Sequence, residues 1–120
     1  MRYVLMLYAD DKAGEAIAPD LMEAFMGQMY AYREALIKAG VFIETNPLAR
    51  ADTACCLRLE NGEVKVHDGP YAETREQLGG YFLISVRNMD EARTWAARCP
   101  AATWGTIEIR QLVETCRSST

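Results

Sequence analysis

The chain has 120 residues, of which 50% are hydrophobic and 25% charged, as expected of one soluble domain with a core of its own. Its net charge of −4, with no basic run, argues against binding to nucleic acid or to an anionic membrane. The longest apolar run, Tyr3 to Ala9, is too short to span a bilayer. It ends at Asp10 without a cleavage site behind it, so we predict no export signal and expect a cytoplasmic protein.

The first third of the chain predicts a strand, a loop and a long helix. The nearly continuous apolar run Tyr3–Tyr8 is typical of a strand that is covered on both faces. A polar loop over 10–18 then leads to a helix predicted to begin at Asp20, as N-cap, and to end at Gly40. Seven apolar residues at helical spacing form one stripe that is expected to fill the core: Met22, Phe25, Met26, Met29, Tyr32, Leu36 and Ile37.

The rest of the chain alternates strand and helix signals after a turn predicted at Asn46-Pro47. The predicted elements are a strand at 53–59, a short strand at 64–67 joined to it by the Asn61-Gly62 turn, a strand at 81–86, a helix capped by Asn88 that ends at Cys99-Pro100, and a strand at 106–113. The polar tail, 114–120, is expected to be flexible.

This order of elements predicts an α+β fold. With the short strand at 64–67 set aside as an extra hairpin arm, the pattern is βαββαβ, a ferredoxin-like sheet with both helices on one face. No linker or repeat interrupts 2–113, so this range is one domain. The other sheet face would be left bare, and the two-sided apolar strand at 3–8 predicts that a second copy covers it in a homodimer.

The cysteines and the one histidine restrict the possible chemistry. Cys55 and Cys56 are adjacent on a predicted strand, point to opposite faces and form no C-x-x-C pair, so the cysteines are interpreted as free thiols. His67 is the only histidine, which excludes a His-rich metal site within one subunit. A cysteine nucleophile would need His67 as its base, paired with Cys99 or Cys116.

The segment 68–81, DGPYAETREQLGGY, carries the most specific pattern in the chain. It resembles the signature of the YCII-related proteins of the DGPF type, in which Asp-Gly-Pro-Phe-Ala-Glu-Thr/Ser-Lys-Glu is followed by Gly-Gly and an aromatic residue. Tyr71 stands for the Phe and Arg75 for the Lys, and the resemblance extends over 2–113. It implies a ferredoxin-like subunit that dimerises into an α+β barrel. The His–Asp site proposed for some members cannot be carried over, because 20–40 contains no histidine.

Asp68 has two interpretations that the sequence leaves open. Its carboxylate either accepts backbone N–H groups in an Asx-type turn before Gly69-Pro70, or faces a cleft at the strand end as a general base. Glu73 and Glu76 flank Arg75 and either form solvated ion pairs or contribute to the same cleft. In the second case Glu73 is the acid partner of Asp68, and Arg75 binds a carboxylate or an enolate.

Four further residues are candidates for substrate binding. Tyr71 and Tyr81 are expected to be half-buried aromatic residues with bonded hydroxyl groups, or else walls of a ligand pocket. Arg110 either forms a cross-strand ion pair or reaches into the cleft, and His67 could tune Asp68.

Two functions follow from these patterns. One is a small enzyme without a metal or other cofactor, in which Asp68 and Glu73 are catalytic and a small organic molecule is bound by Tyr71, Arg75, Tyr81, Arg110 and His67. The alternative is a non-catalytic module that binds a small molecule or docks on a transcription-related protein. The resemblance suggests this alternative, because relatives of the DGPF type are associated with sigma factors.

Overall fold

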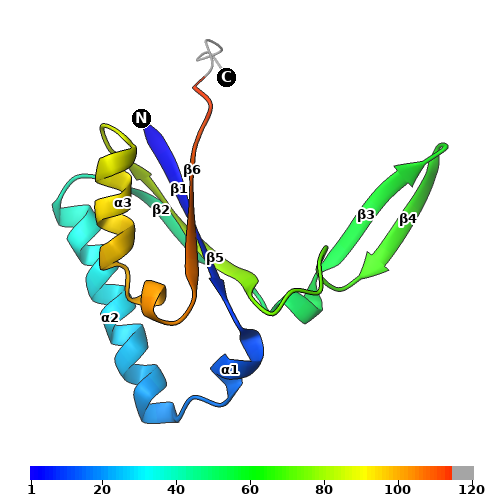
Figure 1. Cartoon of the computed structure of the whole chain (residues 1–120), viewed down its shortest axis with the longest axis horizontal. Coiled ribbons are helices and arrows are strands. Elements are labelled where there is room, and N and C mark those ends of the chain that lie inside the picture. The colour runs from blue at the N-terminus through cyan, green and yellow to red at the C-terminus, as the bar shows by residue number, and fades with distance from the viewer. Residues whose placement is uncertain (115–120) are drawn as a thin grey trace.

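The computed structural model describes residues 1–114 and has an α+β fold, with two helices covering one face of a four-stranded antiparallel sheet (Figure 1). The strands lie in the order β2 (Phe42–Pro47), β5 (Gln77–Ser85), β1 (Arg2–Ala9) and β6 (Thr106–Gln111). The covering helices are α2 (Pro19–Lys38) and α3 (Met89–Arg98). This is the predicted ferredoxin-like arrangement.

A β-hairpin projects away from this body (Figure 1). It consists of β3 (Cys55–Glu60) and β4 (Glu63–Asp68), which form a separate two-stranded sheet, and we call residues 55–68 the arm. The described part of the chain also contains three short helical turns: α1 (Asp11–Glu15), η1 (Ala51–Thr53) and η2 (Pro100–Thr103). The arm was predicted, but both of its strands lie outside the main sheet.

The prediction that 53–59 supplies the second strand of the main sheet is therefore wrong. That strand is β2, in which Asn46 pairs with Tyr81 and Pro47 with Gly80, so the predicted turn at Asn46-Pro47 is wrong as well. Asn-Pro is a turn signal in most contexts, but β2 lies at the sheet edge, where proline needs no ladder partner for its missing N–H.

The start of the long helix also differs from the prediction. Helix α2 begins at Pro19 with Ala18 as N-cap, because proline has a suitable φ for the first helical position, so Asp20 is not the cap. The predicted loop before it contains α1, which Asp10 caps by accepting the N–H groups of Lys12 and Ala13. At the other end Gly40 follows the helix with a φ of +75°, as its predicted role requires.

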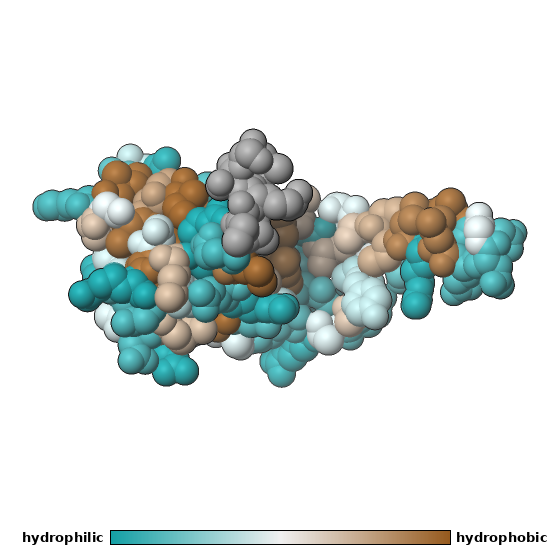
Figure 2. All heavy atoms as spheres, turned by 90° about the horizontal axis from the view of Figure 1, so that it is seen from above, coloured by the Kyte–Doolittle hydropathy of each residue, from teal (hydrophilic) through white to brown (hydrophobic). Residues whose placement is uncertain are grey.

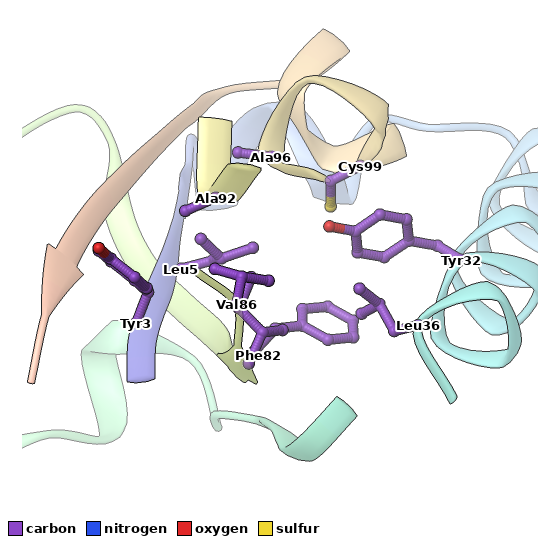
Figure 3. Packing of buried hydrophobic residues seen from close by; sticks show 10 residues of the cluster. Tyr3, Leu5, Tyr32, Leu36, Phe82, Val86, Ala92, Ala96 and Cys99 are labelled. Atoms are coloured by element: carbon purple, nitrogen blue, oxygen red, sulfur yellow. The ribbon is translucent and has the colours of Figure 1, made fainter. Parts of the chain in front are cut away.

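The core lies between the helices and the sheet (Figure 3). The Tyr32 ring packs edge-on against Phe82 with 5.2 Å between centroids, and the Tyr32 hydroxyl donates to the carbonyl of Trp95 at 2.7 Å. This bond ties α2 to α3. Helix α3 begins as predicted, since the Asn88 side chain accepts the N–H of Glu91 at 2.9 Å.

The predicted apolar stripe of α2 is only partly buried. Tyr32 and Leu36 belong to the core, whereas Met26 is 57% and Ile37 44% exposed. The first half of α2, which includes Met26, extends past the end of the sheet (Figure 1), whereas Ile37 lies in the last turn of the helix.

Within residues 1–114, no helix is both long enough and apolar enough to cross a membrane. The predicted tail begins with Glu114, whose carboxylate pairs with Arg2 at 3.2 Å. The remainder of that tail, 115–120, lies outside the described residues.

Candidate active site at the base of the arm

A cavity of 740 Å³ lies where the arm joins the body. Asp68 enters it from the end of β4, and Glu73 and Arg75 enter it from the segment that leads to β5. Asp10, at the end of β1, and Arg50, beside η1, line it from the body. Asp68, Glu73 and Arg75, three of the five candidates in the segment 68–81, therefore share one hollow.

The backbone, and not the Asp68 side chain, holds the bend after the arm. The N–H of Gly69 donates to the carbonyl of Ala54 at 2.7 Å, and Gly69 has a φ of +112°, which favours glycine. The carboxylate of Asp68 accepts no hydrogen bond from residues 1–114, so the geometry does not support an Asx-type turn. The carboxylate remains available to a ligand in the cavity.

Arg75 is held at the cavity by one ion pair, from its Nε to Oδ2 of Asp10 at 3.2 Å. The N–H of Ala13 and, next, the Arg75 guanidinium hold the pKa of Asp10 below its ordinary value. The Arg75 side chain is otherwise exposed, and its guanidinium has further N–H donors for a bidentate contact. Arg75 can therefore bind an anion without leaving Asp10.

The remaining charged residues of the cavity are mostly paired. Arg50 contacts Glu15 at 2.8 Å and Asp52 at 3.5 Å, and Asp11 accepts the N–H of Ala51 at 3.3 Å. Glu73, like Asp68, accepts no hydrogen bond from the described part of the chain. Asp68 and Glu73 thus differ from the structural carboxylates around them.

No three His, Cys, Asp or Glu side chains of residues 1–114 are grouped so as to hold a metal ion. Cys99 is buried in the core, distant from the arm and its His67, so these two do not form the nucleophilic pair that the sequence left open. Cys116 lies outside the described residues.

Tyr71 and His67 lie beside the cavity and not in it. Tyr71 is 87% exposed, so the expectation of a half-buried ring is wrong; the residue follows the bend at Pro70 and points into solvent. His67 and Tyr71 line a separate hollow along the arm. His67 pairs with Cys56 on the arm face opposite to Asp68, because neighbouring residues of a strand alternate.

Tyr81 and Arg110 lie on the sheet face that the helices leave open. The Tyr81 hydroxyl donates to the carboxylate of Glu44 and accepts from the amide of Asn46 at 3.0 Å, so its predicted bonded hydroxyl is present. Arg110 pairs in register with Val4 and forms no ion pair with the described residues. These two residues are not brought together with Asp68.

Sequence reasoning missed Glu44 and Asn46 because it missed β2, and missed Asp10 and Arg50 because they reach the cavity through tertiary structure. One available signal was the Asp10-Asp11 pair directly after the first strand, since side chains at strand ends often line functional clefts.

The family model of the YCII-related domain matches residues 1–115. The chain belongs to the YCII-related family. An uncharacterised protein of Rhizobium meliloti (strain 1021) is 33% identical to it over 114 residues, which cover 93% of this chain and 92% of the relative. That YCII-related relative has no assigned activity, so the chemistry must follow from the residues of the site.

Proposed function

We propose that this YCII-related protein, with the DGPF-type segment at 68–81, is a small cofactor-independent enzyme that transfers a proton on an organic acid or phenol-like substrate. Asp68 is the general base in this proposal. The observation that carries it is the Asp68 carboxylate, which accepts no hydrogen bond from residues 1–114 and lines one cavity with Glu73 and Arg75.

The proposed step is the removal of a proton from a carbon next to a carbonyl group. The C–H bond breaks, its proton moves to the Asp68 carboxylate, and its electron pair becomes an enolate. The guanidinium of Arg75 stabilises the negative oxygen through charge-assisted hydrogen bonds. Asp68 then returns the proton to the substrate. Alternatively, Glu73 in its protonated form donates a proton at a second position, after which Asp68 loses its proton to solvent and Glu73 regains one from solvent.

The size of the cavity supports a small substrate. Its volume of 740 Å³ falls within the range of about 300–1,000 Å³ that is common for small-molecule sites. Its lining is rich in charged side chains and therefore fits an oxygen-rich substrate better than a hydrocarbon.

The proposal predicts that Asp68→Asn removes proton transfer and leaves the fold intact. Small keto acids, lactones and phenols are incubated with the protein in D₂O, and exchange of their C–H protons is followed by NMR. The wild type should exchange at least one of them, and Asp68→Asn should slow that exchange by about 100-fold or more, because the amide cannot accept the proton.

Asp90→Asn is the matched control, since Asp90 is an exposed carboxylate on α3 that pairs with Arg93 at 3.4 Å. It should exchange at the wild-type rate, and circular dichroism should show the same helix content in all three proteins. Equal exchange by Asp68→Asn and wild type would contradict the proposal, as would no exchange of any compound. The second result favours the non-catalytic module.

We further propose that the protein acts as a homodimer in which a second copy covers the open sheet face and the apolar side of the arm. Val4, Met6 and Leu83 are half-buried on that sheet face. An isolated two-stranded hairpin is only marginally stable in water, so the arm needs a cover.

A two-fold axis makes the contact between the arm of one copy and the sheet face of the other twice. Because Asp68 belongs to the arm, a second copy that fixes the arm would also fix the position of the proposed base.

A further inference from the structure

A second hollow, the α2 groove, lies between α2 and the edge of the sheet formed by β2 and β5. It has a volume of 460 Å³, and none of its lining residues lines the cavity at Asp68. Its walls are almost entirely apolar, with Phe25 and Met29 from α2 on one side and Leu7 and Phe82 from the sheet on the other.

The groove is open because neither the helix nor the sheet fills it. Gly79 and Gly80 contribute no side chains, and a Cβ at Gly80 would lie 3.1 Å from the carbonyl oxygen of Asn46, so glycine is needed for β2 to approach. Met26 and Tyr30 stand at the rim and are 57% and 61% exposed. Apolar surface of this extent is costly to leave in water.

The charged group of the groove is positive. Arg33 is the one charged residue among the described residues that line it, and no Asp or Glu joins it there. The guanidinium lies over the ring of Phe42 at 5.4 Å, and its nearest carboxylate oxygen, on the adjacent Glu34, is 3.6 Å away with both side chains well exposed. Such an exposed pair is weak, so the cation can accept a better partner.

We propose that the α2 groove binds a small apolar carboxylate, a molecule with a hydrocarbon body and one anionic end. The hydrocarbon lies against Phe25, Met29 and Phe82, where it replaces water on apolar surface. The carboxylate forms a charge-assisted, bidentate contact with Arg33. This site is separate from the proposed proton-transfer site and does not depend on it.

Octanoate and the neutral 1-octanol test the proposal on the full chain. Calorimetric titration should show saturable binding of both, with octanoate bound about 10-fold more tightly because only it gains the charged contact. Arg33→Gln should reduce octanoate to the affinity of octanol and leave octanol unchanged. In methyl NMR spectra, the Met29 signal should shift with either ligand.

Arg98→Gln is the matched control, because it removes the same charge from α3, where Arg98 lies over Trp95 at 4.2 Å and outside the groove. It should keep the preference for octanoate, and so should Asp68→Asn. The proposal is overturned if the wild type does not bind octanoate. A second copy of the chain that fills the groove would give this result. It is also overturned if Arg98→Gln loses the preference, or if Arg33→Gln retains it.

Discussion

Asp10 and Asp68 are two carboxylates of one cavity with different surroundings. Asp10 accepts the N–H groups of Lys12 and Ala13 and pairs with Arg75, and these contacts lower its pKa. It is therefore a structural anion that caps α1 and holds the guanidinium. Asp68 ends a strand whose backbone is already paired, so its side chain has no structural partner to satisfy.

Cys55 and Cys99 also differ in their surroundings, and the resulting difference in thiol reactivity can be measured. Burial raises the pKa of the Cys99 thiol, whereas Cys55 is exposed on the arm. Because the thiolate is the reactive form, iodoacetamide at pH 8 should label Cys55 at least about 10-fold faster than Cys99. Peptide mass spectrometry after timed labelling gives both rates.

Denaturation provides the control for this experiment. In 6 M guanidinium chloride the two thiols lose their environments, and their labelling rates should become similar. Equal rates in the native protein would contradict the buried position of Cys99 between α3 and α2.

The sequence predicted the candidate site where the residues are close along the chain. Asp68, Glu73 and Arg75 lie within eight positions of one another, and a single bend can bring them to one hollow. Asp10 and Arg50 line the same hollow but come from distant segments of the chain. No local sequence pattern indicates that such segments lie close together in the fold. Tyr71 is exposed, contrary to the prediction, which is wrong because an aromatic residue in a turn has no periodicity that indicates its burial.

At the scale of elements, strong local sequence signals predicted helices and strands correctly, whereas weak signals did not. The structure contains three elements predicted from such signals: the strand β1 from its apolar run, the hairpin at Asn61-Gly62, and the helix capped by Asn88. Strand β2 has mixed polarity and ends in Asn-Pro, so its pairing with β5 is decided by the sheet and not by its own residues. The fold class survived this error because the arm supplied a strand in the same place along the chain.

The effect of replacing a glycine on the free energy of unfolding depends on the element that contains it, and two glycines illustrate this. Gly27 is an exposed position within α2 where an added Cβ meets nothing within 4 Å. Gly27→Ala should therefore raise the free energy of unfolding by about 0.5–1 kcal/mol, since alanine loses less backbone entropy in a helix. Urea denaturation followed by circular dichroism measures the change.

Gly105→Ala is the same change in a different setting. An added Cβ there would clash with the carbonyl oxygen of Tyr8 and lie 3.0 Å from its carbonyl carbon, so β6 would have to move away from β1. We expect a loss of about 2–3 kcal/mol in the same experiment. A neutral result would mean that β6 does not lie against β1 as closely as the register implies.

At the scale of the whole molecule, the apolar residues lie both in the buried core and on an exposed face of the arm. Among residues 1–114, ten of them form the buried core, while Leu57, Leu59, Val64 and Val66 of the arm are each more than half exposed. Hydrophobic side chains gather visibly on the arm (Figure 2). They share one face because Leu57 pairs with Val66 and Leu59 with Val64.

The proposed dimer predicts that this face, and not the opposite one, controls association. Leu57→Thr with Val66→Thr replaces one cross-strand apolar pair and keeps a high strand propensity. It should weaken the dimer by about 10-fold or more, because two buried side chains per subunit lose apolar contact. Sedimentation velocity over a concentration series measures the dissociation constant.

Arg58→Thr with Lys65→Thr is the control, since these residues form the adjacent cross-strand pair on the opposite face of the arm. It should dissociate like the wild type. A wild type that remains monomeric at micromolar concentration would refute the dimer, and equal weakening by both double variants would assign the effect to the hairpin itself.

The closure at the base of the arm has an evolutionary consequence. The chain leaves the body at Ala54 and returns at Gly69, where one backbone hydrogen bond of 2.7 Å joins the two points. Residues 55–68 therefore behave as an insertion whose ends meet, so mutations can lengthen, shorten or repattern them without disturbing the registers of the main sheet. In the proposed dimer, the surface that meets the second copy could then diverge among descendants of this chain while the main sheet stays constant. Because Asp68 is the last residue of the insertion, such divergence would also alter the surroundings of the proposed general base.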